Sequence, residues 1–163
     1  MKKTLTTASA LLIVISSFAQ LTIKEKTDEM TDKTYYTVSE GLVCANEEST
    51  KGFRIDANVS VKNDSKVIED LIVKLVGLEK CNEKNVLIIL FDNGEKVTLT
   101  SWNKFNCKGK AYFSLSPKTI EALKHNEISK IRATNGRSFK SFTKDLEYKN
   151  YFIELFEALN KLN

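Results

Sequence analysis

Apolar and polar residues alternate with a period of two in the clearest structural signal of this chain. From Phe53 to Val61 every second residue is apolar, and the residues between them are polar. Successive side chains of a strand point to opposite faces, so this pattern predicts a strand with one buried face. Turn-forming residues at 62–65 and a second apolar segment at 67–78 predict that the chain reverses there and pairs with this strand.

Further strands are predicted on both sides of this pair. They are expected at 21–26, 34–39, 42–45, 86–91, 95–102, 111–115, 128–134 and 137–143. The segment 86–91 is apolar at every position, which predicts a central strand covered on both faces. The dipeptides Asn93-Gly94 and Asn135-Gly136 each predict a two-residue hairpin loop, because asparagine and glycine accept the positive φ angles of tight turns.

Two helices are predicted in the second half of the chain. Ser116 followed by Pro117 marks the start of a short connecting helix at about 117–125, because the hydroxyl accepts from a free amide and proline suits the first turn. Apolar residues at helical spacing predict an amphipathic C-terminal helix at about 146–161. We therefore expect a mainly β (α+β) protein of seven to nine antiparallel strands in a sandwich or half-open barrel, with the last helix covering a sheet face or an open end.

The N-terminal segment has the pattern of a secretory signal peptide. Two lysines precede the apolar run 10–15, and small residues at 17 and 19 predict cleavage before Gln20. The apolar run is too short to span a membrane. We expect residues 1–19 to be removed and residues 20–163 to form a single exported domain, periplasmic or extracellular, without a transmembrane segment.

Three cysteines remain after such processing, and an oxidising compartment favours a disulfide. Cys81 and Cys107 lie on the two arms of the hairpin predicted at 93–94, where a two-residue loop places Cys81 opposite Asn106. A bulge or a small change of register aligns the two cysteines. The sequence therefore predicts a Cys81–Cys107 disulfide, with Cys44 buried or free, and three unpaired core thiols are the alternative.

Charge is distributed unevenly along the chain. Residues 96–144 hold 11 basic residues against two acidic ones, a net of +9, whereas residues 20–95 have a net charge of −5. A basic half favours an anionic partner such as a surface glycan, a lipid head group or an acidic envelope protein. Alternating lysines on a solvated sheet face account for the same pattern without a partner. Nucleic acid is not expected as a partner, because no recognition motif is present.

Five residues are candidates for contacting such a ligand: Trp102, Lys130, Arg132, Arg137 and Lys140. Paired guanidinium groups can hold a phosphate, sulfate or carboxylate. An exposed Trp102 among lysines can stack a sugar or a base. In the alternative, the C-terminal helix covers the face of the predicted strand 95–102 that carries Trp102, and Trp102 packs on Phe152 or Phe156.

Motifs for catalysis are missing from the sequence. His125 is the only histidine, and there is no Cys-x-x-Cys or His-Glu-x-x-His pair, so no metal or other cofactor is expected. Nucleophile-elbow, P-loop and dinucleotide glycine motifs are also missing. We expect a non-enzymatic binding or interaction module. A small secreted enzyme with a carboxylate site or a Cys44–His125 pair, and an envelope assembly component that pairs through a strand edge, are the alternatives.

Overall fold

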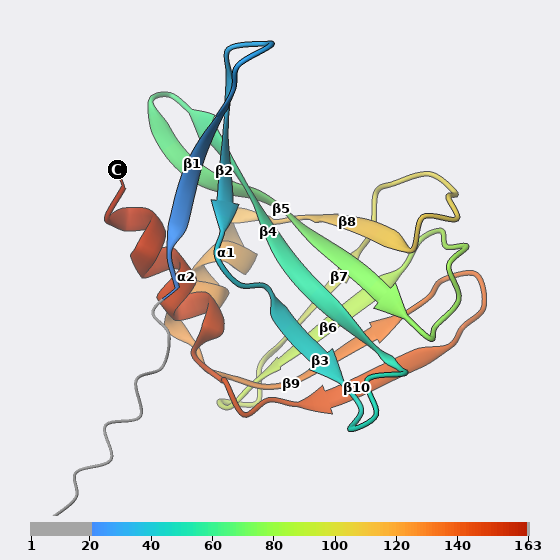
Figure 1. Ribbon diagram of the computed structural model, residues 1–163. Coiled ribbons are helices and arrows are strands. Elements are labelled where there is room, and N and C mark those ends of the chain that lie inside the picture. The colour runs from blue at the N-terminus through green and yellow to red at the C-terminus, as the bar shows by residue number, and fades with distance from the viewer. Residues whose placement is uncertain (1–20, 163) are drawn as a thin grey trace, which may run out of the picture.

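The computed structural model describes residues 21–162 as two antiparallel sheets and two helices (Figure 1). The larger sheet consists of β1 (Ile23–Asp28), β2 (Lys33–Val38), β3 (Leu42–Ala45), β4 (Gly52–Lys62), β5 (Ser65–Val76) and β8 (Lys110–Ser114). The smaller sheet consists of β6 (Val86–Phe91), β7 (Lys96–Thr100), β9 (Ile128–Thr134) and β10 (Ser141–Asp145). Helix α1 (Pro117–His125) connects β8 to β9, and helix α2 (Tyr151–Asn160) follows β10.

The predicted class, a mainly β protein with a connecting helix and a C-terminal helix, is confirmed. The described residues form ten strands, each overlapping one of the predicted ranges but exceeding the predicted total of seven to nine, and the two sheets do not close into a barrel. The predicted signal peptide and its cleavage site lie outside the described residues. Within residues 21–162, neither helix has the length and apolar character needed to cross a membrane.

The long hairpin of β4 and β5 forms the centre of the larger sheet. The two strands pair from Gly52 opposite Val76 to Lys62 opposite Ser65, with a bulge after Asn58. Both β2 and β3 lie on the other side of β4, and β8 completes the sheet beside β5. The predicted reversal at 62–65 is therefore confirmed.

The core lies between the two sheets and is closed by α2. Residues of the larger sheet such as Phe53 and Leu71 are buried together with Leu87 and Ile131 of the smaller sheet. The apolar stripe of α2 joins them through Tyr151, Phe152, Leu155, Phe156 and Leu159. The predicted amphipathic helix is thus present, but it begins at Tyr151 rather than near residue 146.

The start of α1 agrees with its prediction. The Ser116 hydroxyl accepts from the Thr119 amide at 3.2 Å, and Pro117 occupies the first turn. This capping satisfies one of the amides that a helix leaves without an internal partner. A purely local signal therefore sufficed to place this helix.

Strand β6 is not covered on both faces, contrary to the prediction. Leu87 and Ile89 are buried between the sheets, whereas Val86, Ile88 and Leu90 on the opposite face are half-buried. We call the face of each sheet that is turned away from the other sheet its outer face. The uninterrupted apolar run thus supplies one row to the core and one row to the outer face of the smaller sheet.

Both predicted two-residue hairpin loops are wrong. Leu90 pairs with Lys96, and the Phe91 amide donates to the Glu95 carbonyl, so the first loop has three residues, 92–94. In the second, Thr134 pairs with Ser141 and the Asn135 amide donates to the Lys140 carbonyl, so four residues, 136–139, lie between the last paired residues, and β10 starts later than predicted. Gly94 in the first loop has a φ of 84°, so the positive φ angle predicted for this glycine is present although the predicted loop length is wrong.

The helices and the long loops lie at opposite ends of the sheets (Figure 1). The β5–β6 loop (77–85), the segment between β7 and β8 (101–109) and the β9–β10 loop (135–140) gather at the end away from α1 and α2. We call this the loop end. Both disulfide cysteines and three of the predicted ligand residues come from these loops: Cys81, Trp102, Cys107, Arg137 and Lys140.

Candidate functional site

A disulfide joins two loops of the loop end. The predicted bond between Cys81 and Cys107 is present. Beyond the regular strands, Asn82 and Asn106 form an isolated antiparallel bridge, which sets the next residues outward, Cys81 and Cys107, opposite each other. The small register change needed to align the cysteines is therefore present between this bridge and the β6–β7 ladder.

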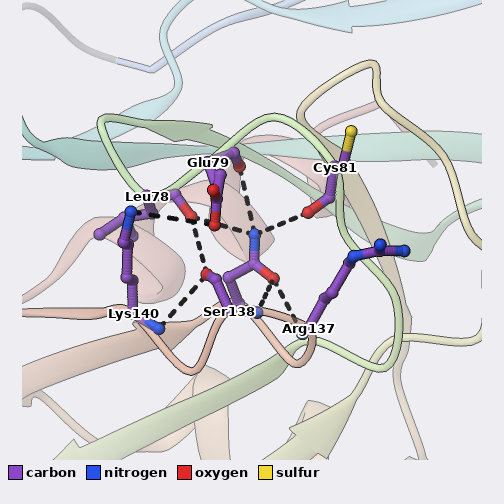
Figure 2. A network of polar contacts seen from close by, with 7 residues as sticks. Leu78, Glu79, Cys81, Arg137, Ser138 and Lys140 are labelled. Carbon is purple, nitrogen blue, oxygen red and sulfur yellow. Dashed lines mark hydrogen bonds and ion pairs between the residues drawn. The ribbon is translucent and has the colours of Figure 1, made fainter.

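A buried asparagine attaches the third loop. Asn135 is 0% exposed, and its side-chain amide nitrogen is shared among the backbone carbonyls of Leu78 (3.0 Å), Glu79 (3.2 Å) and Cys81 (3.1 Å) (Figure 2). Its side-chain oxygen accepts from the backbone amides of Arg137 (2.9 Å) and Ser138 (3.2 Å). One side chain therefore holds the β5–β6 loop and shapes the β9–β10 loop at once.

A second buried asparagine continues this network. The Asn85 oxygen accepts from the Gly136 amide at 3.0 Å, and its nitrogen donates to the Asn82 side chain at 3.2 Å. A Cβ atom on Gly136 would lie 2.2 Å from the carbonyl oxygens of Glu83 and Lys84. Glycine is required at 136 for this close approach rather than for a tight turn.

The network places Arg137 and Lys140 at the surface of the loop end. The Arg137 guanidinium lies 4.9 Å from the ring centroid of Phe105, which joins the β9–β10 loop to the 101–109 segment. The Lys140 ammonium lies 3.9 Å from a carboxylate oxygen of Glu79. Neither residue joins Lys130 and Arg132, so the structure divides the basic patch predicted around residues 135–136 into two parts.

Lys130 and Arg132 lie on the outer face of the smaller sheet. The register places Ile88 beside Arg132, and it places Leu90 between Lys130 and Lys96. These side chains and Thr143 line a shallow groove of about 250 Å³. We call this surface the cationic face. It has an aliphatic floor along β6 and cations on both sides.

Neighbouring groups orient two of these cations. The Lys130 ammonium pairs with Asp145 at 3.0 Å, and the Arg132 Nε donates to the Thr143 hydroxyl at 2.9 Å. The Lys96 ammonium has no hydrogen-bond or ion-pair partner within residues 21–162. Lys96 was not among the residues predicted from the sequence, because the predicted two-residue loop places it opposite Phe91, whereas the structure pairs it with Leu90.

Trp102 lies apart from the cationic face, in a segment that runs beside β8. Its backbone amide donates to the Tyr112 carbonyl at 3.0 Å, and its ring lies with its centroid 5.5 Å from that of Tyr112. Trp102 is 60% exposed. The alternative in which α2 covers Trp102 is therefore wrong, and the ring that Trp102 contacts is Tyr112 rather than Phe152 or Phe156.

Cys44 and His125, the pair considered for catalysis, make no contact with each other within residues 21–162. Cys44 is buried in β3, and burial raises the pKa of its thiol to about 12. His125 lies at the end of α1 with its side chain 71% exposed, 3.3 Å from Glu121. Among residues 21–162 no group of three His, Cys, Asp or Glu side chains is arranged to hold a metal ion.

We predict that Cys44 resists alkylation in the native protein. The thiolate is the reactive form, and with a pKa of about 12 it makes up roughly one in ten thousand thiols at pH 8. Iodoacetamide followed by intact-mass measurement should show no adduct on folded protein and one adduct per chain in guanidinium. Rapid labelling under native conditions would contradict the buried position of β3.

No protein-family model, curated protein or solved structure matches this chain.

Proposed function

We propose that this protein is an exported, non-enzymatic binding module whose cationic face holds an acidic protein segment of the cell envelope. The observation that carries the proposal is the groove over Ile88 and Leu90, with Lys96 on one side and Lys130 and Arg132 on the other. Cations on both sides of an apolar floor suit an extended chain that carries carboxylates at its edges. Export is supported by the N-terminal leader pattern and by the Cys81–Cys107 disulfide.

The floor of the groove favours a polypeptide over the other anionic partners. Ile88 and Leu90 are aliphatic and lie two residues apart on one strand, a spacing that matches alternate side chains of an extended peptide. Stacking of a glycan ring calls for an aromatic floor, which this groove does not have. The Lys96 ammonium has no partner within the described residues and can meet a carboxylate without breaking an existing ion pair.

Charge reversal tests this proposal. A synthetic peptide of alternating glutamate and leucine should bind the processed protein, and added salt should weaken the binding. The triple variant Lys96→Glu, Lys130→Glu, Arg132→Glu should bind about tenfold more weakly or worse, because each reversal replaces an attraction with a repulsion. Fluorescence anisotropy of labelled peptide measures both effects.

A matched variant controls for net charge. Lys24, Lys26 and Lys51 are exposed and lie outside the cationic face, so reversing these three should leave peptide binding unchanged. Asp145→Asn releases Lys130 and should tighten binding. Equal loss in both triple variants would show that only net charge matters. Selective binding of phosphatidylglycerol vesicles or polygalacturonate in place of the peptide would show that the partner class is wrong.

A further inference from the structure

Trp102 belongs to a polar and aromatic cluster on the outer face of the larger sheet, separate from the cationic face. Its indole nitrogen donates to Asp70 Oδ1 at 3.2 Å, and the Ser114 hydroxyl donates to the same oxygen at 2.9 Å. Asp70 and Ser114 are paired across β5 and β8, and the Tyr112 ring contacts Trp102. We call these four residues the aromatic patch.

The aromatic patch holds its tryptophan ring in place while leaving it accessible. A hydrogen bond to a carboxylate and a contact with a second ring fix the indole, yet Trp102 is 60% exposed. A ring that is ordered before binding loses little conformational entropy when a ligand covers it. The patch is therefore suited to stacking a flat, partly apolar group.

Asp70 supplies a hydrogen-bond acceptor beside this ring. Both side-chain donors reach Oδ1, whereas Oδ2 receives no hydrogen bond within residues 21–162. Asp70 is only 8% exposed, but Oδ2 keeps some contact with solvent. Asn58 lies directly opposite Asp70 on β4, on the same outer face, and its amide can both donate and accept. Polar groups that can engage adjacent hydroxyls therefore border the aromatic surface.

The charges around the patch select among ligands of this shape. The Asp70 carboxylate disfavours an anion. Lys74 and Lys110 are paired with each other further along the same two strands and on the same face, and Lys74 forms an ion pair with Asp56 at 2.8 Å, so the surroundings of the patch favour neither sign of charge. A pyranose ring is neutral, has an apolar C–H face and carries hydroxyls at its edge, so it meets each of these conditions.

We propose that the aromatic patch is a binding site for a neutral sugar ring, which stacks on Trp102 and donates a hydroxyl to Asp70 Oδ2. This site is independent of the proposed function, because none of its residues belongs to the cationic face. It adds a glycan contact on one sheet to the acidic-protein contact proposed for the other.

The single tryptophan of the chain makes the test direct. Cellotetraose, maltotetraose and chitotetraose are titrated separately into the processed protein, and at least one should give a saturable change in tryptophan fluorescence that salt does not weaken. By calorimetry, Trp102→Ala should weaken that binding about tenfold or more, and Trp102→Phe should weaken it less because a ring remains. Asp70→Asn should also weaken it, since an amide oxygen is a poorer acceptor than a carboxylate.

Two control variants distinguish this site from a second exposed aromatic residue and from the cationic face. Phe139→Ala removes a ring that is 80% exposed at the loop end, and it should leave sugar binding unchanged. The Lys96, Lys130 and Arg132 reversal variant should also bind the sugar normally, so failure of one proposal does not decide the other. No saturable signal with any of the three sugars, or stronger binding of tetramethylammonium than of any sugar, would overturn the proposal.

Discussion

Replacing Asn135 with aspartate is expected to lower the free energy of unfolding by about 4 kcal/mol or more, because a buried carboxylate then faces carbonyl oxygens without a donor. The side-chain nitrogen of Asn135 serves three backbone carbonyls, and an oxygen in its place repels all three. Asn135→Ala leaves the same carbonyls unpaired without adding charge, and a loss of about 2–3 kcal/mol is expected. Urea unfolding followed by circular dichroism measures both variants.

The alanine variant keeps this prediction testable if the aspartate variant does not fold. Asn160→Ala serves as the control, since Asn160 is exposed at the end of α2 and should change stability by no more than about 0.5 kcal/mol. If Asn135→Ala is as stable as the control, water replaces the amide without cost, and the network does not hold the loop end together.

Removing the disulfide is expected to cost about 3 kcal/mol of stability, because a cross-link over 26 residues restricts the unfolded chain. The double variant Cys81→Ala, Cys107→Ala should therefore unfold at a lower urea concentration, with little change in its circular dichroism spectrum. The regular strands β6 and β7 pair independently of the bond, so the fold itself should persist.

Wild-type protein treated with dithiothreitol provides the matched measurement. It should unfold at the same urea concentration as the double variant, and equal midpoints for oxidised and reduced wild type would contradict the prediction. Intact mass of the native protein checks the bond and the leader together. A chain that begins at Gln20 and gains two hydrogens on reduction is expected, whereas an intact leader with reduced thiols would contradict export.

The parts of the fold that were predicted correctly depend on local signals. Alternation in 53–61 identified β4, and Ser116-Pro117 identified the start of α1, because period and capping act within a few residues. The cysteine pairing was also within reach, since both residues lie on the arms of one hairpin.

The errors arise where a distant contact overrides a local preference. Asn135-Gly136 has the composition of a tight turn, but the asparagine side chain instead bonds to carbonyls more than 50 residues earlier in the chain. The glycine is used for close approach to Lys84. Similarly, the apolar run of β6 predicts burial of both faces, but the sequence does not show that the outer face is only half-buried in the folded protein.

By itself the sequence determined the mainly β class, the two helices, the paired cysteines and an uneven distribution of charge, because periodicity, turn residues and composition are all read along the chain. Only the tertiary structure decided which cations share a surface and which ring is exposed. It places Lys96 and Lys130 on either side of Leu90 in β6. It also brings the Trp102 indole within hydrogen-bond distance of Asp70, which lies on the other side of β8. Strand order and register bring these side chains together, and both depend on contacts between residues far apart in the sequence.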